Sequence, residues 1–242
     1  MPYNHFAEYY DKLMQNVNYN KRANYVLSLF EKFDRKPTLL LDLACGTGEF
    51  SKRFSNMGID VIGVDPSIEM LNIARQKLPN SLFLSQKAEE LDLFGTVDGA
   101  VCLMDSLNHI INYNDFSKAI KNVALFLEKD RLFIFDVNTE YKHNELLSDN
   151  TFVIEDDNVF CTWQNYTEQN NLTEITLDFF EITKDGKYDR YCDEFSERAY
   201  SHNEILKALE KAKLELVSVF GDLTNNEPTK TEERVFYITR KK

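Results

Sequence analysis

Two glycines placed two residues apart, Gly46 and Gly48, are the residues of this chain whose spacing most directly indicates chemistry. They stand in the string LLLDLACGTGEFS at 39–51, where an apolar run ends at Asp42 and an amphipathic segment begins at Glu49. This pattern predicts a buried strand, a tight turn and a helix start. Glycine lets a ligand approach the main chain closely, and the first N–H groups of the helix point into the same space. The turn therefore predicts a site for a small polar ligand at the carboxyl end of a strand, where open α/β sheets bind ligands.

An acid at the end of the next predicted strand is the second feature that indicates a ligand site. Asp65 ends the string VIGVD and follows Gly48 by 17 residues. A carboxylate there can accept hydrogen bonds from both hydroxyls of a ribose held over the glycine turn. The alternative is that Asp65 caps the next helix, because Pro66 follows it at a helix start. We expect the ribose role, because the turn and the acid occur together at a suitable separation.

The small residues of the turn distinguish between two ribose-bearing ligands. A dinucleotide turn reads G-x-G-x-x-G/A, and its third small residue packs the helix on the strand. Here the pattern is Ala44-x-Gly46-x-Gly48, and Ser51 stands where the third small residue belongs. The carboxylate of Asp42 disfavours a pyrophosphate and suits a ligand with an ammonium or sulfonium charge. The turn thus favours S-adenosylmethionine over a nicotinamide dinucleotide.

The composition limits the class of partner. The chain has 242 residues, of which 43% are hydrophobic, and 40 acidic residues against 28 basic ones give a formal net charge of −12. That charge repels polyphosphate, so we expect a small-molecule partner and no nucleic acid. No run approaches the roughly 18 apolar residues of a membrane span, and the first 14 residues do not resemble a signal peptide, so we expect a cytoplasmic protein without a membrane partner. The four cysteines form no C-x-x-C pair, which predicts reduced thiols and no metal site.

Alternating strand and helix patterns predict the fold class of the first half of the chain. Buried strands that are separated by helices imply right-handed βαβ units and a parallel sheet. The predicted strands are 38–43, 59–64, 82–85, 97–103 and 131–137, and the predicted helices are 5–15, 19–33, 49–56, 66–77 and 115–127.

The pattern changes near residue 148. The segments that follow are rich in β-branched and aromatic residues and have no helix between them, which predicts an antiparallel β insert on the substrate side of the molecule. Its strands are expected at 151–154, 159–167, 172–183 and 187–199. A capping box of Ser201 and Glu204 then opens a helix to about residue 213. With final strands at 214–220 and 234–240, the expected organisation is an α/β domain of residues 1–147 and 200–242 and an insert of residues 148–199.

Five strings, spread over nearly the whole chain, carry a family resemblance: DLACGTG at 42–48, VDPSIEML at 64–71, YNHFAEYYDKLM at 3–14, LMDSLNHI at 103–110 and FDVNTEYK at 135–142. The first two resemble the class I S-adenosylmethionine-dependent methyltransferases. The other three look like one bacterial subgroup of these enzymes, of small-molecule type. The resemblance implies a Rossmann-like sheet of seven strands in the order 3-2-1-4-5-7-6, with the last strand antiparallel and helices on both faces.

The resemblance also implies a set of residues around S-adenosylmethionine. These are Tyr3, Tyr10, Asp42, Ala44, Gly46, Gly48, Asp65, Ile68, Met70, Ala88 and Asp105. Aromatic residues at helical spacing are commonly core, which is the alternative for the two tyrosines. Two departures concern the cofactor: Lys87 stands where relatives commonly carry an acid for the adenine amino group, and Arg22 stands where they tend to have an aromatic residue.

Methyl transfer is an in-line displacement, so much of the catalysis comes from holding the reacting atoms in line. A nitrogen or oxygen nucleophile can also need a general base. His109 is the candidate that we favour, with Asp136 and His143 as other candidates, and each has a structural alternative as a loop, turn or surface residue. Candidate acceptor contacts are Trp163, Arg198 and Tyr200, with packing against the core as the alternative.

The expected function is methyl transfer from S-adenosylmethionine to a small molecule. Leu103-Met104-Asp105-Ser106 stands where enzymes that methylate exocyclic amines of nucleic-acid bases carry N/D-P-P-Y/F. Two alternatives remain open: an RNA or protein methyltransferase that docks through the insert, and a non-catalytic module that binds the adenosyl ligand.

Overall fold

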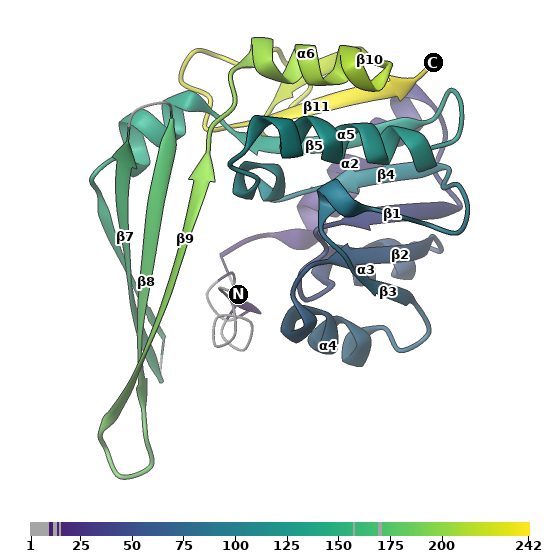
Figure 1. Ribbon diagram of the computed structural model, residues 1–242. Coiled ribbons are helices and arrows are strands. Elements are labelled where there is room, and N and C mark those ends of the chain that lie inside the picture. The colour runs from purple at the N-terminus through teal and green to yellow at the C-terminus, as the bar shows by residue number, and fades with distance from the viewer. Residues whose placement is uncertain (1–9, 12–13, 15, 157, 169–170) are drawn as a thin grey trace.

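A computed structural model of the chain describes residues 10–11, 14, 16–156, 158–168 and 171–242, and its main element is a mixed sheet of seven strands (Figure 1). The strands are β1 (Leu39–Leu43), β2 (Asp60–Asp65), β3 (Leu82–Ser85), β4 (Gly99–Cys102), β5 (Leu132–Asn138), β10 (Leu214–Gly221) and β11 (Arg234–Lys241). Their order is β3-β2-β1-β4-β5-β11-β10, and β11 runs antiparallel to both of its neighbours. The predicted strand order is therefore confirmed.

Helices cover both faces of this sheet. They are α2 (Tyr19–Phe33), α3 (Glu49–Asn56), α4 (Ile68–Lys77), α5 (Tyr113–Phe126) and α6 (His202–Ala212), with short turns of 3-10 helix at η1 (Ala88–Glu90) and η2 (Ser106–His109) and of π-helix at η3 (Lys142–Leu147). One buried cluster joins α2 and α3 to the sheet through Phe30 and Phe54, and another joins α5 and α6 through Phe116 and Ile205. Burial of these apolar side chains is the main source of stability for such layers. None of the helices among the described residues is long and apolar enough to cross a membrane.

Local sequence accounts for the helix ends. The predicted capping box begins α6: the Ser201 hydroxyl accepts from the Glu204 N–H, and the Glu204 carboxylate accepts from the Ser201 N–H. The helix predicted at 115 begins two residues earlier, because the Asn112 side chain accepts the first free N–H groups of α5. The predicted helix 5–15 lies largely outside the described residues.

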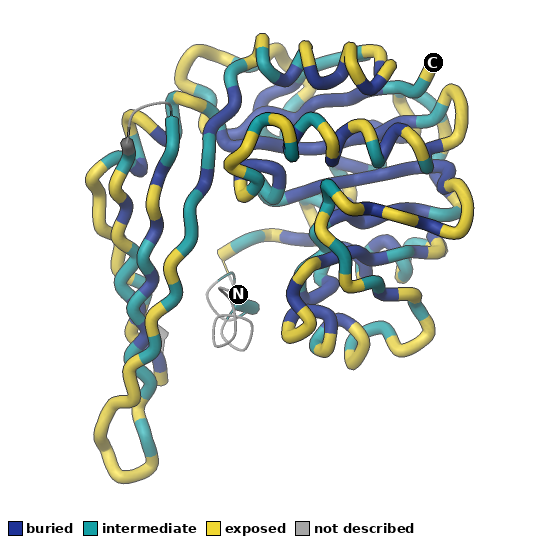
Figure 2. Tube along the Cα trace, viewed as in Figure 1, coloured by how far each residue is buried: buried dark blue, intermediate teal, exposed yellow. Residues whose placement is uncertain are grey.

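A second sheet confirms the predicted antiparallel insert. It contains β6 (Thr151–Asp156), β7 (Val159–Glu168), β8 (Leu172–Ile182) and β9 (Tyr188–Arg198), paired in chain order. A small buried cluster that includes Cys161, Leu177 and Phe179 holds these strands together. Figure 1 shows this sheet beside the main sheet, and Figure 2 shows that the tip of its β8–β9 hairpin is exposed. The upper part of β9 therefore lies near the carboxyl ends of the central parallel strands.

Candidate functional site

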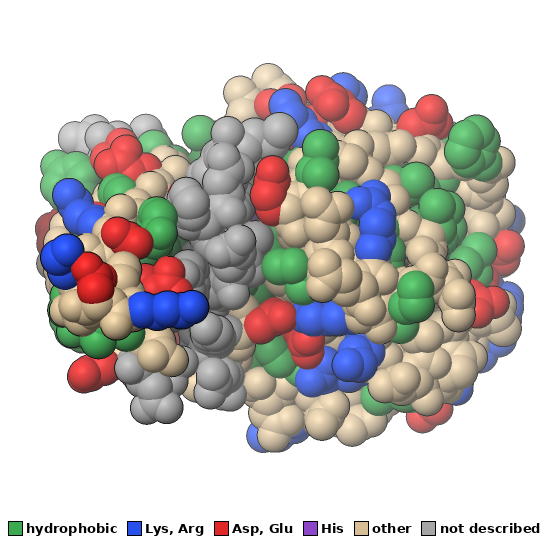
Figure 3. All heavy atoms as spheres, turned by 90° about the horizontal axis from the view of Figure 1, so that it is seen from below, with side chains coloured by type: hydrophobic (Ala, Val, Ile, Leu, Met, Phe, Trp, Pro, Cys, Tyr) green, Lys and Arg blue, Asp and Glu red, His purple; other side chains and the backbone are tan. Residues whose placement is uncertain are grey.

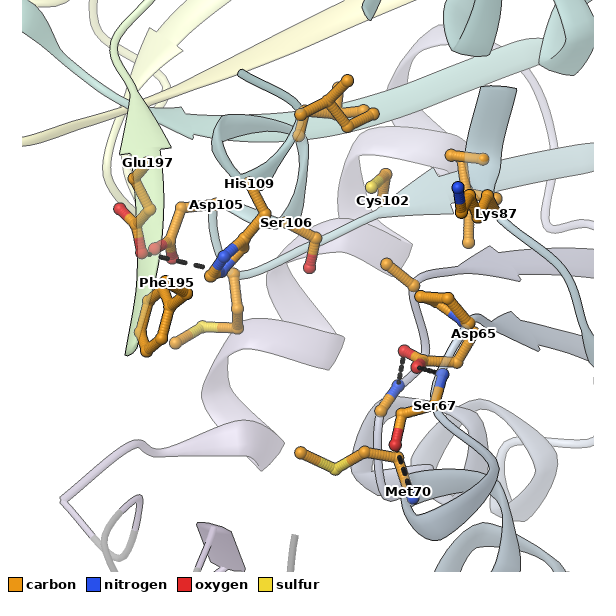
Figure 4. Close-up of a pocket in the computed structure, with 18 of the residues that line it drawn as sticks. Asp65, Ser67, Met70, Lys87, Cys102, Asp105, Ser106, His109, Phe195 and Glu197 are labelled. Carbon is orange, nitrogen blue, oxygen red and sulfur yellow. Dashed lines mark hydrogen bonds and ion pairs between the residues drawn. The ribbon is translucent and has the colours of Figure 1, made fainter. Parts of the chain in front are cut away.

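A cavity of about 690 Å³ lies at the carboxyl ends of β1, β2 and β4 and reaches the second sheet. Its volume is within the range of about 300–1,000 Å³ that is usual for small-ligand sites. The structure brings together many of the predicted site residues in its wall: Tyr10, Ala44, Gly46, Asp65, Met70, Ala88, Asp105, His109 and Trp163. Figure 4 shows Asp65 on one side of the cavity and His109 and Glu197 on the other.

The turn between β1 and α3 is joined to the end of β2 by Asp65. The Gly46 N–H donates to one oxygen of the Asp65 carboxylate and the Ser67 N–H to the other, both at 2.9 Å (Figure 4). Burial raises the pKa of Asp65, and these two hydrogen bonds oppose that effect. Ser67, not Asp65, is the N-cap of α4, since its hydroxyl accepts from the Met70 N–H at 3.2 Å. The carboxylate of Asp65 therefore stabilises the turn and faces the cavity.

The backbone of this turn is in the left-handed region at three residues. The φ angles are 56° at Ala44, 53° at Gly46 and 77° at Gly48. A Cβ on Gly46 would meet nothing within 4 Å, whereas one on Gly48 would lie 3.0 Å from the Cβ of Ala74. Gly46 therefore faces open space where a ligand fits, and Gly48 allows α3 and α4 to pack closely.

Asp42 lies behind the turn and outside the cavity wall. Its side chain is 2% exposed, and the Ser51 hydroxyl donates to it at 2.5 Å. Burial raises the pKa of Asp42 to about 7, against the effect of that hydrogen bond, and the negative charge of Asp65 raises it further. Ser51, which stands where a dinucleotide turn has its third small residue, thus serves as the hydrogen-bond partner of the buried Asp42.

Asp105 follows β4 and is held by a buried network. Its backbone is left-handed, with φ 51°, and its N–H and that of Met104 donate to the carboxylate of Asp136. Arg234 lies between the two acids: its guanidinium is 2.6 Å from Asp105 and also pairs with Asp136. Burial, the largest single influence, would raise the pKa of Asp105, but Arg234, Lys142 and His109 together outweigh it and hold that pKa well below its usual range. Asp105 is therefore a fixed negative charge in the cavity wall.

His109 and Glu197 form a pair between the turn that follows β4 and the second sheet. His109 lies on η2, and Glu197 lies near the end of β9. The Nε2 atom of His109 is 3.6 Å from a carboxylate oxygen of Glu197, and its ring packs on that of Phe195 with 5.3 Å between centroids (Figure 4). Glu197 is buried, while the His109 side chain is 34% exposed. With Asp105, the two residues offer ligand atoms within 4.8 Å of one another.

Comparison with known proteins assigns the family. Residues 40–130 match the model of a methyltransferase domain. The chain is 33% identical over 245 residues to YqeM of Bacillus subtilis strain 168, which carries the name of a methyltransferase, and the match covers 100% of this chain and 98% of YqeM. It is 32% identical to an S-adenosylmethionine-dependent methyltransferase of Clostridium acetobutylicum ATCC 824, whose crystal structure matches with a TM-score of 0.90 over 99% of this chain and 98% of that one. The chain belongs to the S-adenosylmethionine-dependent methyltransferases.

A more distant structure shows the same fold in this methyltransferase family. CalS10, an amino pentose methyltransferase from Micromonospora echinaspora, matches with a TM-score of 0.78 and 18% identity, over 98% of both chains, and its structure has S-adenosylmethionine bound. S-adenosylmethionine is the methyl donor of the present enzyme. The open left-handed turn and the carboxylate of Asp65 fit this donor, because they offer close backbone approach and a hydrogen-bond acceptor on one side of the cavity.

Several predicted site residues lie outside the cavity wall of the methyltransferase. Arg198 donates to Glu204 at 2.7 Å, and the Tyr200 hydroxyl donates to the Ile110 carbonyl. Ile68 is half exposed on α4, and Tyr3 lies outside the described residues. The polar groups of Arg198 and Tyr200 are thus already used in joining β9 and α6 to the main sheet.

The two other candidate bases are buried behind the wall. Asp136 is engaged by Arg234 and by two backbone N–H groups. His143 is fully buried, and its Nδ1 atom lies 2.8 Å from the Thr173 hydroxyl. Burial lowers the pKa of His143 to about 4, so its ring is neutral near pH 7. Neither group reaches the cavity.

The two departures noted in the sequence differ in their consequences. Lys87 lines the cavity next to Ala88, on the Asp65 side, so a cation stands where relatives commonly place an acid. Arg22 is turned to Asp222, with which it makes two hydrogen bonds of 2.7 and 2.9 Å. Arg22 therefore connects α2 to the segment after β10 and does not line the cavity.

Proposed function

We propose that this methyltransferase transfers its methyl group to a small molecule that binds between the main sheet and the second sheet. One observation carries the proposal: a single cavity joins the glycine turn and Asp65 to side chains of β7 and β9. A cavity of about 690 Å³ suits two small ligands in contact, and their alignment supplies much of the rate of a displacement reaction.

The donor side of the cavity is assigned to the main sheet. We expect Asp65 to bind the ribose, the backbone of Ala44 and Gly46 to lie along the methionine part, and Asp105 to lie near its amino group. Met70, Lys87 and the η1 backbone at Ala88 are the expected surroundings of the adenine. Tyr10 lines the cavity from the N-terminal segment. When bound there, S-adenosylmethionine supplies a methyl carbon activated by a sulfonium charge.

The acceptor side is assigned to the insert of residues 148–199. Trp163, Leu177 and Phe195 give it apolar and aromatic walls, and His109 and Glu197 give it polar groups. The amino pentose on which CalS10 acts is a small acceptor, and this supports an acceptor of similar size here. His109 lies between the two sides, where it can take part in moving a proton from the acceptor to solvent.

An RNA acceptor is the less favoured alternative because of charge. The net charge of −12 repels polyphosphate. Figure 3 shows lysine and arginine side chains interspersed with aspartate and glutamate on the face seen from below. Such a mixed surface does not form the continuous basic stripe that a long nucleic acid requires.

Two measurements test the proposal together. Calorimetric titration with S-adenosylmethionine and S-adenosylhomocysteine should give binding well below about millimolar, the weak end of specific affinities. Incubation with methyl-labelled S-adenosylmethionine and three fractions of a bacterial extract, small molecules, total RNA and total protein, should place the label in the first fraction. Label in RNA or protein would contradict the small-molecule acceptor, and binding without transfer to any fraction would favour a non-catalytic module.

A further inference from the structure

Glu197 is a buried carboxylate whose hydrogen-bonding capacity is not used within the described part of the chain. Its side chain is 7% exposed, and the nitrogens nearest to its two oxygens are His109 Nε2 at 3.6 Å and His143 Nε2 at 3.7 Å. Both distances exceed those of direct hydrogen bonds. A buried ionised carboxylate without donors is costly, so a donor from outside the described residues, such as a ligand in the cavity, would stabilise it. Glu197 lines the cavity, which is where such a group can enter.

The groups behind Glu197 do not neutralise its charge. His143 Nε2 is buried without a hydrogen-bond partner among the described residues, while its Nδ1 lies 2.8 Å from the Thr173 hydroxyl. That hydroxyl is 3.0 Å from the Thr167 hydroxyl, so a chain of hydroxyls orders the imidazole from behind. The Thr167 hydroxyl also donates to the His143 carbonyl at 3.3 Å, so the imidazole is held with Nδ1 toward Thr173 and Nε2 toward Glu197. Burial keeps His143 uncharged by lowering its pKa to about 4.

The charges that face this side of the cavity favour a cationic ligand. Asp105, Asp136 and Glu197 are three acids, and the permanent cations that act on them are Arg234, Lys142 and, on Asp136, Arg22. Arg22 is paired with Asp222. Arg234 is held between Asp105 and Asp136, and the Lys142 amino group is 3.1 Å from the Asn138 side chain. His109 adds a charge only when it is protonated. Among these three acids, Glu197 is therefore the one that lines the cavity without a direct partner in the described part of the chain.

The aromatic walls point to the same ligand chemistry. Phe195 and Trp163 line the cavity, and the Phe195 ring lies against His109. Aromatic faces attract cations, most strongly where water is excluded.

We infer that the methyl acceptor presents a protonatable amino nitrogen and that Glu197 binds this nitrogen, so that the reaction is an N-methylation. This inference rests on the proposed function and names its substrate class. Glu197 receives a proton from the acceptor ammonium, and the freed lone pair of the amine forms a bond to the methyl carbon. The carbon–sulfur bond breaks with its electron pair going to sulfur, and the methylated nitrogen carries the positive charge. Burial raises the pKa of Glu197, which suits it to accept the proton, and the part-exposed His109 connects it to solvent.

A divalent cation is the competing occupant of the same groups. Asp105, His109 and Glu197 offer three ligand atoms, but Arg234 already lies 2.6 Å from Asp105. The like charge of that guanidinium opposes a second cation on this carboxylate. The amine, which needs Glu197 alone, is favoured.

Matched amines and alcohols test the inference on the full chain saturated with S-adenosylhomocysteine. The probes are 2-phenylethylamine with 2-phenylethanol and glucosamine with glucose, and calorimetry gives the dissociation constants. We expect at least one amine to bind about tenfold or more tightly than its alcohol. In Glu197→Gln the amine should lose about tenfold or more in affinity while the alcohol is unchanged, and Glu197→Asp should keep part of the preference. Glu194→Gln, an exposed acid on the same strand, is the control.

Three results of these titrations would contradict the inference. The inference is overturned if amines bind no better than alcohols, if Glu197→Gln changes both probes equally, or if amine binding needs added Mn²⁺ or Zn²⁺. Unchanged binding of S-adenosylhomocysteine by Glu197→Gln shows that the variant is folded. Failure of the wild type to bind S-adenosylmethionine or S-adenosylhomocysteine would instead contradict the proposed function, so the two failures are distinct.

Discussion

The guanidinium of Arg234, on β11, lies 2.6 Å from the carboxylate of Asp105, at the end of β4. The same guanidinium pairs with Asp136 on β5, the strand that lies between them in the sheet. Asp136 in turn accepts hydrogen bonds from the backbone of Asp105 and of its neighbour Met104. One cation thus fixes a left-handed segment in the wall of the cavity, and three strands share it.

Removal of this cation should destabilise the protein strongly. Arg234→Met leaves two carboxylates buried without a counter-charge, so we expect a loss of about 3–5 kcal/mol in the free energy of unfolding, measured by urea denaturation. Arg190→Met is the matched control, because Arg190 pairs with Asp178 at an exposed position and should change stability by less than about 1 kcal/mol. Equal effects of the two variants would show that the Arg234 pair contributes no more than a surface pair.

Loss of the carboxylate of Asp65 should weaken binding of the methyl donor. Asp65→Ala removes the expected acceptor for the ribose hydroxyls and the acceptor of the Gly46 and Ser67 N–H groups. We expect a loss of about 1–3 kcal/mol in the binding free energy of S-adenosylmethionine by calorimetry. Asp60→Ala, at the exposed start of the same strand, is the control. An affinity unchanged by Asp65→Ala would remove the ribose assignment.

Burial of Asp42 should make stability decrease as the pH rises. The folded-state pKa of about 7 lies above the ordinary value of 3.8, so between these values the folded protein retains a proton that the unfolded chain has released. The free energy of unfolding therefore falls from about pH 4 to pH 7. Asp42→Asn abolishes this titration, and its stability relative to wild type should rise by on the order of 2–4 kcal/mol between pH 4 and pH 8, measured by denaturation at each pH. Parallel curves for the two proteins would contradict the raised pKa of Asp42.

Opposite to the effect of Asp42, burial of His143 should make the free energy of unfolding increase as the pH rises from about 4 to 6.5. Its folded-state pKa of about 4 lies below the ordinary value of 6.5, so the unfolded chain takes up a proton first as the pH falls. This contribution to the free energy of unfolding is fully present above pH 6.5 and is lost toward pH 4. His143→Asn should therefore lose less stability than wild type on acidification, again measured by denaturation. Because the effects of Asp42 and His143 oppose each other in wild type, the variants are required to separate them.

The sequence predicts the strands of the sheet and the turn that we assign to the donor because their determinants are local. The glycine turn, the acid at the end of β2 and the capping box of α6 each lie within a few residues of the element that they specify. Alternation of strands and helices predicts a parallel sheet, whereas the strand order is what the family resemblance implies. The position of Lys87 in the site could likewise be predicted, because it follows β3 directly. Its effect on binding of the cofactor could not be predicted.

The side of the cavity that we assign to the acceptor could not be predicted, because it depends on which face of a strand meets the cavity. Side chains alternate along β9, so Glu197 and Phe195 share one face of the strand. The sequence favours Arg198, one position away, because neither face has a distinctive pattern. The partner of Asp105 was also missed: Arg234 comes from a distant strand, and only the register of β5 and β11 places it beside both acids. The available indication is an arginine at the start of a strand that otherwise reads VFYIT.

The second sheet is joined to the main sheet by two short connections, near residues 139–150 and 199–201. On the assignment proposed above, everything that recognises the donor lies outside this sheet, and Glu197, Phe195 and Trp163 lie within it. Substitutions confined to β7 and β9 can therefore retarget the enzyme to new acceptors while its donor affinity is retained. This arrangement suits the chain to directed evolution, because selectivity for the acceptor can be varied in the second sheet while the methyl-transfer reaction is kept.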